Sequence, residues 1–249
     1  MPMNDVPDFS HIAPEYSASR PRYPAALFAW LAGLLDRHDV ALDVACGSGQ
    51  AALGLATHFA RVIATDVSAG QIENAIQHPH IEYRVAPSEQ SGLPSHSVDL
   101  VTVAAAVHWF DLPHFYAEAQ RVIRTGGVLA AWTYHVAHVE PPLDTVLGPF
   151  YRDLLAPYFA PGARLVDARY ETLALPGQPL PSPSFSVSVE WTADQVLRFM
   201  RTWSGVHAYM AATGIDPVLE IEAAIRDALG GNGHPAVLRW PLYTRASRL

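Results

Sequence analysis

Short apolar runs recur along the first half of the chain, separated by stretches that carry apolar residues at helical spacing. The runs are too short for helices and read as buried strands, one beginning at Val40 and the others over Val62–Thr65, Ile81–Ala86, Val98–Ala106 and Val128–Tyr134. Strands that alternate with helices predict an α/β fold whose sheet is parallel and doubly wound.

The flanking segments have weaker patterns. Residues 1–23 are polar and rich in proline, and Pro24 is expected to begin a helix with Leu27, Leu31 and Leu34 on one face. Residues 139–165 are rich in proline and aromatic residues and predict a helical cap. Leu175–Ser184 reads as a proline-rich loop.

The end of the chain predicts two more strands and a helix between them. Phe185, Val187, Val189 and Trp191 alternate along one strand, and Thr192 then caps a helix. Ala236–Arg245 reads as the final strand, with Pro241 indicating an edge position. The Gly126-Gly127 pair is expected to end the helix that begins at Leu112.

We expect one domain over residues 1–249, without a separate second unit. Its parts are an N-terminal flap and helix (1–36), a cofactor-binding core (37–135), and a cap with the C-terminal strands (136–249).

The first strand runs directly into a glycine turn, Cys46-Gly47-Ser48-Gly49, and helix-forming residues follow at once. Glycine permits close approach of a ligand to the backbone, and a helix N-terminus offers unpaired N–H donors. The next strand ends at Asp66, where a carboxylate would meet the ribose hydroxyls of a nucleotide. The pattern predicts a nucleoside-containing cofactor, with Asp66 facing a cleft and contributing little to packing.

Two cofactors fit the turn. Gly47, Gly49 and Ala52 satisfy G-x-G-x-x-G/A, which is typical of nicotinamide or flavin binding. Asp43, inside the strand, would repel a pyrophosphate. The same carboxylate suits S-adenosylmethionine, which has no phosphate and carries an ammonium and a sulfonium.

Several motifs resemble known families. Asp43–Gly49 resembles motif I of the class I methyltransferases, D/E-x-G-x-G-x-G, with Ala45 where that family usually has glycine. Tyr16–Pro24 and the string His108–Asp111 resemble type 11 methyltransferases related to trans-aconitate methyltransferase. The resemblance covers roughly residues 9–135 and implies a seven-stranded, mostly parallel sheet in which a late strand is antiparallel. It also implies that Tyr16, Arg20 and Tyr23 form a flap over S-adenosylmethionine, although as loop residues they could equally be surface packing.

In that family the turn after the third strand carries an acidic residue at the adenine. Here Pro87 takes its place, so the adenine contact is assigned to Ser88 or Glu89. The residues expected to contact the cofactor are Tyr16, Arg20, Asp43, Ala45, Gly47, Gly49, Asp66, Val67, Gln71, Ser88, Glu89, Ala104 and Ala105.

The methyl acceptor is expected to be a small molecule, with a carboxylic acid preferred. A carboxylate is ionised at neutral pH and needs no base, whereas an amine, phenol or thiol needs one, for which His108 is the candidate. His108 could instead be a polar residue at the corner where a strand becomes a loop. Arg20, Arg22 and Arg201 are the candidate partners for an acid. The expected substrate contacts are Tyr23, Trp109, Trp203 and Arg201.

Composition narrows the classes of function. The net charge is −8, which disfavours nucleic acid, and every basic residue is arginine, which excludes lysine-dependent P-loop and pyridoxal sites. The single cysteine, Cys46, and the lack of a long apolar run or signal peptide favour a cytoplasmic protein without a membrane span. The pairs His78/His80 and His135/His138 lack a convincing third ligand, so no metal is expected.

Two alternatives remain from the sequence. One is an NAD(P)-dependent oxidoreductase, and the other is a methyltransferase homologue that binds the cofactor but acts on a protein partner. Fold alone does not decide between them.

Overall fold

The computed structural model describes residues 21–136, 143–231 and 233–249. The predictions that concern Tyr16, Arg20 and His138 lie outside these residues.

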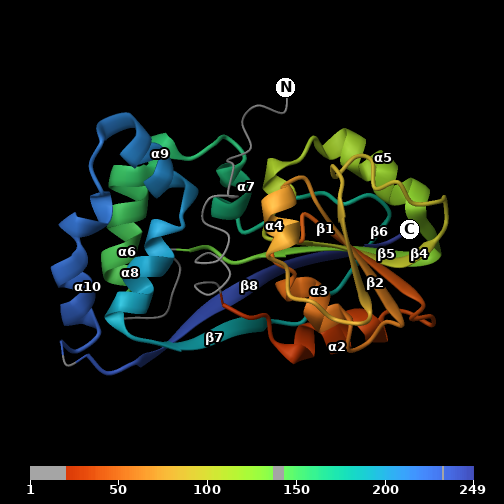
Figure 1. Cartoon of the computed structure of the whole chain (residues 1–249), viewed down its shortest axis with the longest axis horizontal. Coiled ribbons are helices and arrows are strands. Elements are labelled where there is room, and N and C mark those ends of the chain that lie inside the picture. The colour runs from red at the N-terminus through yellow and green to blue at the C-terminus, as the bar shows by residue number, and fades with distance from the viewer. Residues whose placement is uncertain (1–20, 137–142, 232) are drawn as a thin grey trace.

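A mostly parallel sheet forms the centre of the molecule (Figure 1). Its parallel strands are β1 (Val40–Val44), β2 (Arg61–Asp66), β3 (Ile81–Val85), β4 (Val98–Ala104) and β5 (Ile123–Thr133). They lie in the order β3-β2-β1-β4-β5, and the long strand β8 (Ala236–Arg248) pairs antiparallel with β5. The prediction of a doubly wound sheet with a late antiparallel strand is confirmed.

The described residues contain eight strands, one more than the seven expected. The additional strand is β6 (Gln178–Leu180), within the segment predicted as a loop, and it pairs with the end of β8. Prolines led to the wrong prediction, but an edge strand tolerates a residue without an N–H, and Pro179 lies at such an edge. Strand β7 (Phe185–Trp191) pairs with the first half of β8, and Pro241 lies there opposite Ser186.

Helices cover both faces of the sheet. On one face lie α2 (Ala25–Gly33) and α3 (Gln50–Leu55), and on the other lies α5 (Leu112–Val122), as Figure 1 shows. Helix α4 (Ala69–Glu73) follows β2 and begins as predicted at Ser68, whose side chain accepts a hydrogen bond from Gln71 N.

The Gly126-Gly127 pair does not end α5. The helix stops at Val122, and β5 begins at Ile123, whose backbone is already extended. Gly126, with φ +83°, lies inside β5 and donates its N–H to Leu249 O at 2.7 Å. The pair therefore shapes the start of the strand, where Gly127 allows the backbone of Asp99 to approach closely.

A helical cap stands beyond the carboxyl ends of the parallel strands (Figure 1). Its helices and helical turns are α6 (Asp144–Pro149), η4 (Phe150–Leu155), η5 (Ala156–Tyr158), α8 (Ala193–Arg201), α9 (Ser204–Thr213), η6 (Pro217–Glu220) and α10 (Glu222–Ala228). Helix α7 (Ala163–Asp167) lies between the cap and the sheet. Thr192 and Gln195 form the predicted cap at the start of α8, a complete capping box.

Candidate functional site

The glycine turn between β1 and α3 leaves room for backbone only. Ala45, Gly47 and Gly49 all have positive φ, of +54°, +53° and +89°. A Cβ at Gly49 would lie 2.1 Å from the hydroxyl oxygen of Tyr83, which donates to Ile76 O at 2.7 Å. Tyr83 thus closes one side of the turn, and only glycine fits at position 49. Ala45 adopts the left-handed conformation that the usual glycine would take without strain.

Asp66, at the end of β2, holds this turn in place. Its Oδ2 accepts the Gly47 N–H at 2.9 Å, and its Oδ1 accepts the Ser68 N–H at 2.9 Å. Burial raises the pKa of Asp66, while the backbone N–H donors act in the opposite direction. The expectation that Asp66 contributes little to packing is therefore wrong, because this carboxylate joins the ends of two strands. A carboxylate has further lone pairs, so these two bonds leave capacity for ribose hydroxyls.

Replacing Asp66 with alanine should lower both stability and cofactor affinity. Two backbone N–H groups would lose their acceptor, at about 1–3 kcal/mol, and the turn would lose its anchor. We expect S-adenosylhomocysteine to bind about 10- to 100-fold more weakly in calorimetry. The matched control is Asp111→Ala, which removes the carboxylate that caps α5. Equal affinities of wild type and Asp66→Ala would exclude Asp66 from the site.

Asp43 lies beneath the turn, where its side chain is fully buried. Its Oδ1 accepts the Thr102 hydroxyl at 2.8 Å, and its Oδ2 has no hydrogen-bond partner among the described residues. Burial raises the pKa of Asp43 to about 7, which the Thr102 hydroxyl opposes. Asp43 therefore influences a ligand through its charge, since its side chain is closed off from the surface.

Two exposed valines lie at the ends of neighbouring strands. Val67 follows β2 and is 53% exposed, and Val85 ends β3 and is 57% exposed. Exposed apolar side chains at this edge suit the flat face of a nucleobase. Val85 was missed from the sequence, although the alternation of β3 places an apolar residue there. In the following turn the Ser88 hydroxyl donates to the Glu89 carboxylate at 3.0 Å.

The same edge continues at the end of β4, the other neighbour of β1. Ala104 ends β4, and Ala105 has φ +53° and donates its N–H to Trp132 O at 2.7 Å. Two alanines in left-handed conformations, Ala45 and Ala105, thus follow adjacent strands. Backbone strain of this kind gathers at ligand sites. Gln71 lies close to Gly47, and its buried Oε1 has no partner among the described residues.

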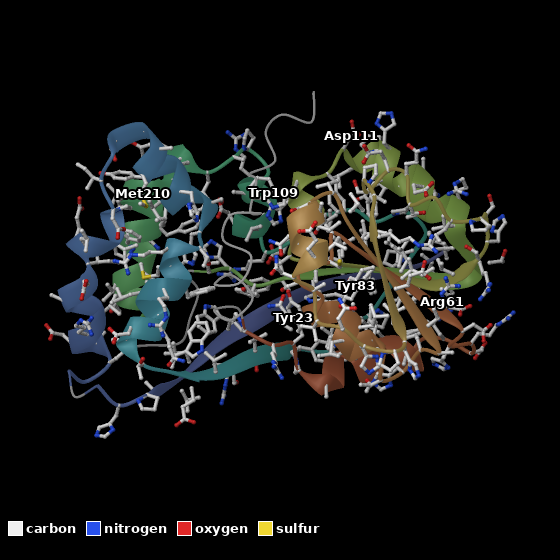
Figure 2. The ribbon with its side chains drawn as sticks, in the orientation of Figure 1. Tyr23, Arg61, Tyr83, Trp109, Asp111 and Met210 are labelled. Carbon is white, nitrogen blue, oxygen red and sulfur yellow. The ribbon has the colours of Figure 1, made fainter. Side chains whose placement is uncertain are left out.

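His108 lies in η3 (Val107–Trp109), directly after this edge. Its Nδ1 lies 3.0 Å from the Tyr170 hydroxyl, and its ring packs beside Trp109, with the ring centroids 5.0 Å apart. Burial lowers the pKa of His108 to about 4, so the imidazole is neutral at pH 7. Figure 2 shows Trp109, Tyr23 and Tyr83 in the middle of the molecule, where the sheet meets the cap.

Three of the expected substrate residues pack against or pair with other side chains of the protein. Trp203 is only 2% exposed and packs against Phe150, Tyr151 and Phe199, so it belongs to the core of the cap. Arg201 is paired with Asp216, with Nε and Oδ2 2.8 Å apart, and is not a free guanidinium for an acid. Tyr23 is half-buried and meets Trp132 edge to face, with the ring centroids 5.5 Å apart.

A polar cluster near the site was missed from the sequence. His135 Nε2 lies 3.1 Å from Asp167 Oδ1, and the Tyr151 hydroxyl donates to the same oxygen at 2.9 Å. Like Tyr170, these residues come from distant parts of the chain, so no spacing indicates that they meet. In the part of the chain that the structure describes, no group of three or more metal-ligating side chains occurs, and no helix is long and apolar enough to cross a membrane.

The residues at the ends of β1, β2, β3 and β4 fit S-adenosylmethionine. The turn excludes side chains at Gly49, the exposed valines offer an apolar surface, and two carboxylates, Asp43 and Asp66, lie around the turn. Negative charge at this position favours a ligand with an ammonium and a sulfonium over one with a pyrophosphate.

Comparison with known proteins agrees with this assignment. A family model described as a methyltransferase domain matches residues 42–131. A protein of Dictyostelium discoideum that is named as a methyltransferase is 32% identical over 247 residues, covering 96% of this chain and 94% of its own length. A Saccharomyces cerevisiae protein named as an S-adenosylmethionine-dependent methyltransferase is 29% identical over 48% of this chain and 44% of its own length.

A solved structure from Anaeromyxobacter dehalogenans, described as a type II methyltransferase, superimposes with a TM-score of 0.83. It is 45% identical and covers 92% of this chain and 97% of its own. These similarities favour methyl transfer over the nicotinamide alternative. The chain belongs to the class I methyltransferases, the enzymes that use S-adenosylmethionine as cofactor.

Proposed function

We propose that this enzyme methylates a small organic acid on a carboxylate oxygen. The proposal rests on the protonation and hydrogen bonding of His108. This histidine is the candidate base, and it lies just after the carboxyl end of β4, at the edge of the sheet where we place the cofactor. Its pKa is lowered to about 4, and its Nδ1 is engaged by Tyr170, so it is a poor proton acceptor at neutral pH. A carboxylate that accepts the methyl group is already ionised and needs no general base.

The bound cofactor supplies an electrophilic methyl group on a sulfonium. The chain's own residues then have four tasks. The turn at Gly47 and Gly49, together with Asp66, orients the cofactor. The apolar side chains of Val67 and Val85 hold its nucleobase. The aromatic cap excludes water, and His108 and Trp109 lie where an acceptor would meet the cofactor edge. Positioning and exclusion of water provide most of the acceleration in such a transfer.

Measurements of turnover test which chemical class of methyl acceptor the enzyme uses. Di- and tricarboxylic acids are incubated with S-adenosylmethionine, beside amines, phenols and thiols, and S-adenosylhomocysteine formation is measured. We expect turnover with an acid. At saturating cofactor, kcat should stay level from about pH 6 to about pH 9, since no general base titrates in that range.

Turnover restricted to an amine or phenol, and lost in His108→Ala, would overturn the proposal and make His108 a base. Product that forms only when a protein is added would instead favour a macromolecular acceptor. The net charge of −8 makes nucleic acid an unsuitable acceptor.

A further inference from the structure

The chain after the cap's first helices runs tightly against His108. A Cβ at Gly162, just before α7, would lie 1.9 Å from the carbonyl oxygen of His108. Only glycine allows this approach, so α7 begins in contact with the histidine's backbone. The segment that follows α7 then brings Tyr170 to the histidine's ring.

Tyr170 is held there at a cost in backbone strain. It is fully buried, and both it and Arg169 have positive φ, of +56° and +53°. Non-glycine residues adopt this conformation only where the surroundings impose it. The Tyr170 N–H donates to Leu165 O at 2.8 Å, and Arg245 Nε donates to Tyr170 O at 2.9 Å. The fold therefore specifies the position of this phenol closely.

The directions of the hydrogen bonds follow from the groups around the phenol. Burial raises the pKa of Tyr170, so the phenol keeps its proton and can donate it. Among the described residues, the Tyr170 hydroxyl has one hydrogen-bond partner, His108 Nδ1. A buried O–H without an acceptor is costly. The Tyr170 proton is then directed to His108 Nδ1, 3.0 Å away.

The opposite direction, from a His108 Nδ1–H to the phenol oxygen, would leave the buried Tyr170 proton without an acceptor among the described residues. Donation from Tyr170 to His108 Nδ1 is therefore favoured. With Nδ1 accepting, a neutral imidazole carries its proton on Nε2. In the part of the chain that the structure describes, His108 Nε2 has no hydrogen-bond partner.

We propose that Tyr170 is a positioning residue that fixes His108 as the Nε2–H tautomer, which donates a hydrogen bond to an oxygen of the methyl acceptor. The identity of the methyl acceptor in this proposal rests on the proposed function. The assignment of the His108 tautomer does not. One carboxylate oxygen forms the bond to the methyl carbon while the carbon–sulfur bond breaks and its electron pair stays on sulfur. The other oxygen accepts from Nε2–H, and no proton is transferred.

The tautomer is measured directly by NMR of ¹⁵N-histidine-labelled protein, in which long-range ¹H–¹⁵N correlations distinguish the two ring nitrogens. The His108 signals are identified by their loss in His108→Gln. We expect the wild type to carry the proton on Nε2. Tyr170→Phe, which removes only the hydroxyl, should give a mixture of tautomers and lower kcat by about 10-fold, as lost hydrogen bonds of about 1–2 kcal/mol imply.

Tyr116→Phe is the matched control. Tyr116 packs against the same core cluster as Tyr170, and its hydroxyl has no partner among the described residues. This variant should leave the His108 signals and kcat unchanged. Arg245→Leu provides a second variant with an intact phenol, and it should broaden or shift the His108 signals because the Tyr170 carbonyl loses its donor.

A wild-type proton on Nδ1 would overturn the proposal, as would an unchanged tautomer in a folded Tyr170→Phe protein. An Nε2–H tautomer together with turnover of amines only would leave the positioning role intact and refute the acid acceptor. The two failures are therefore distinguishable.

Discussion

Replacing Gly49 with alanine should destabilise the protein by about 2–5 kcal/mol and abolish detectable cofactor binding. The left-handed backbone, with φ +89°, costs an alanine about 1–2 kcal/mol. The new methyl group would also meet the Tyr83 hydroxyl, and overpacking of a closed site costs about 1–3 kcal/mol. Thermal unfolding and calorimetric titration with S-adenosylhomocysteine measure the two effects.

Gly126→Ala separates strain from collision. Gly126 has a similar φ of +83°, but a Cβ there would meet nothing within 4 Å. Gly126→Ala should therefore lose about 1–2 kcal/mol of stability from backbone strain alone and bind the cofactor with normal affinity. If both variants lost the same stability and both bound the cofactor, the packing of Tyr83 against the turn would be irrelevant to the site.

The second large effect concerns the buried carboxyl of Asp43 and pH. In the folded protein its pKa is about 7, whereas the unfolded chain has the ordinary value of 3.8. Between these values the folded protein holds a proton that the unfolded chain has released, so stability falls as pH rises. A shift of about 3 pKa units corresponds to about 4 kcal/mol, lost between about pH 4 and about pH 7.

Asp43→Asn should flatten this dependence, because the amide is neutral at every pH and can still accept from Thr102. The free energy of unfolding, measured with urea across the range, gives the comparison. The difference between wild type and variant isolates Asp43 from Asp66, whose pKa is also raised. Parallel curves for the two proteins would mean that Asp43 is ionised in the fold.

The same carboxyl predicts how binding responds to pH. S-adenosylmethionine is cationic and favours the ionised form of Asp43, so its affinity should rise between about pH 6 and about pH 8. This dependence should disappear in Asp43→Asn. The pH dependence arises from cofactor affinity, so kcat measured at saturating cofactor should not change with pH. General-base catalysis would instead change kcat.

The strands of the core could be predicted because each is a short apolar run beside recognisable turn chemistry. The glycine turn and Asp66 were found for the same reason, since their spacing is local. The structure changed the role of Asp66, from an open carboxylate to the acceptor that joins Gly47 to Ser68. Which side chains a strand-end carboxylate meets depends on the neighbouring strand, which local spacing does not specify.

The errors share a different cause. Strand β6 was taken for a loop because its prolines oppose pairing, while its edge position tolerates them. Trp203 and Arg201 were assigned to substrate from residue type, but one is core and the other is paired with Asp216. Tyr170 could not be found, because its contact with His108 spans 62 residues and depends on two left-handed residues.

We propose that the edge of the sheet formed by Gly47, Gly49, Asp66, Val67 and Val85 holds the cofactor. A crystal structure of the protein with S-adenosylhomocysteine would locate the ligand. We expect its ribose at Asp66, its base against the two valines and its amino-acid end at the glycine turn. Density for the ligand away from this edge, for instance in the open hollow beside Tyr243 and Arg169, would contradict it.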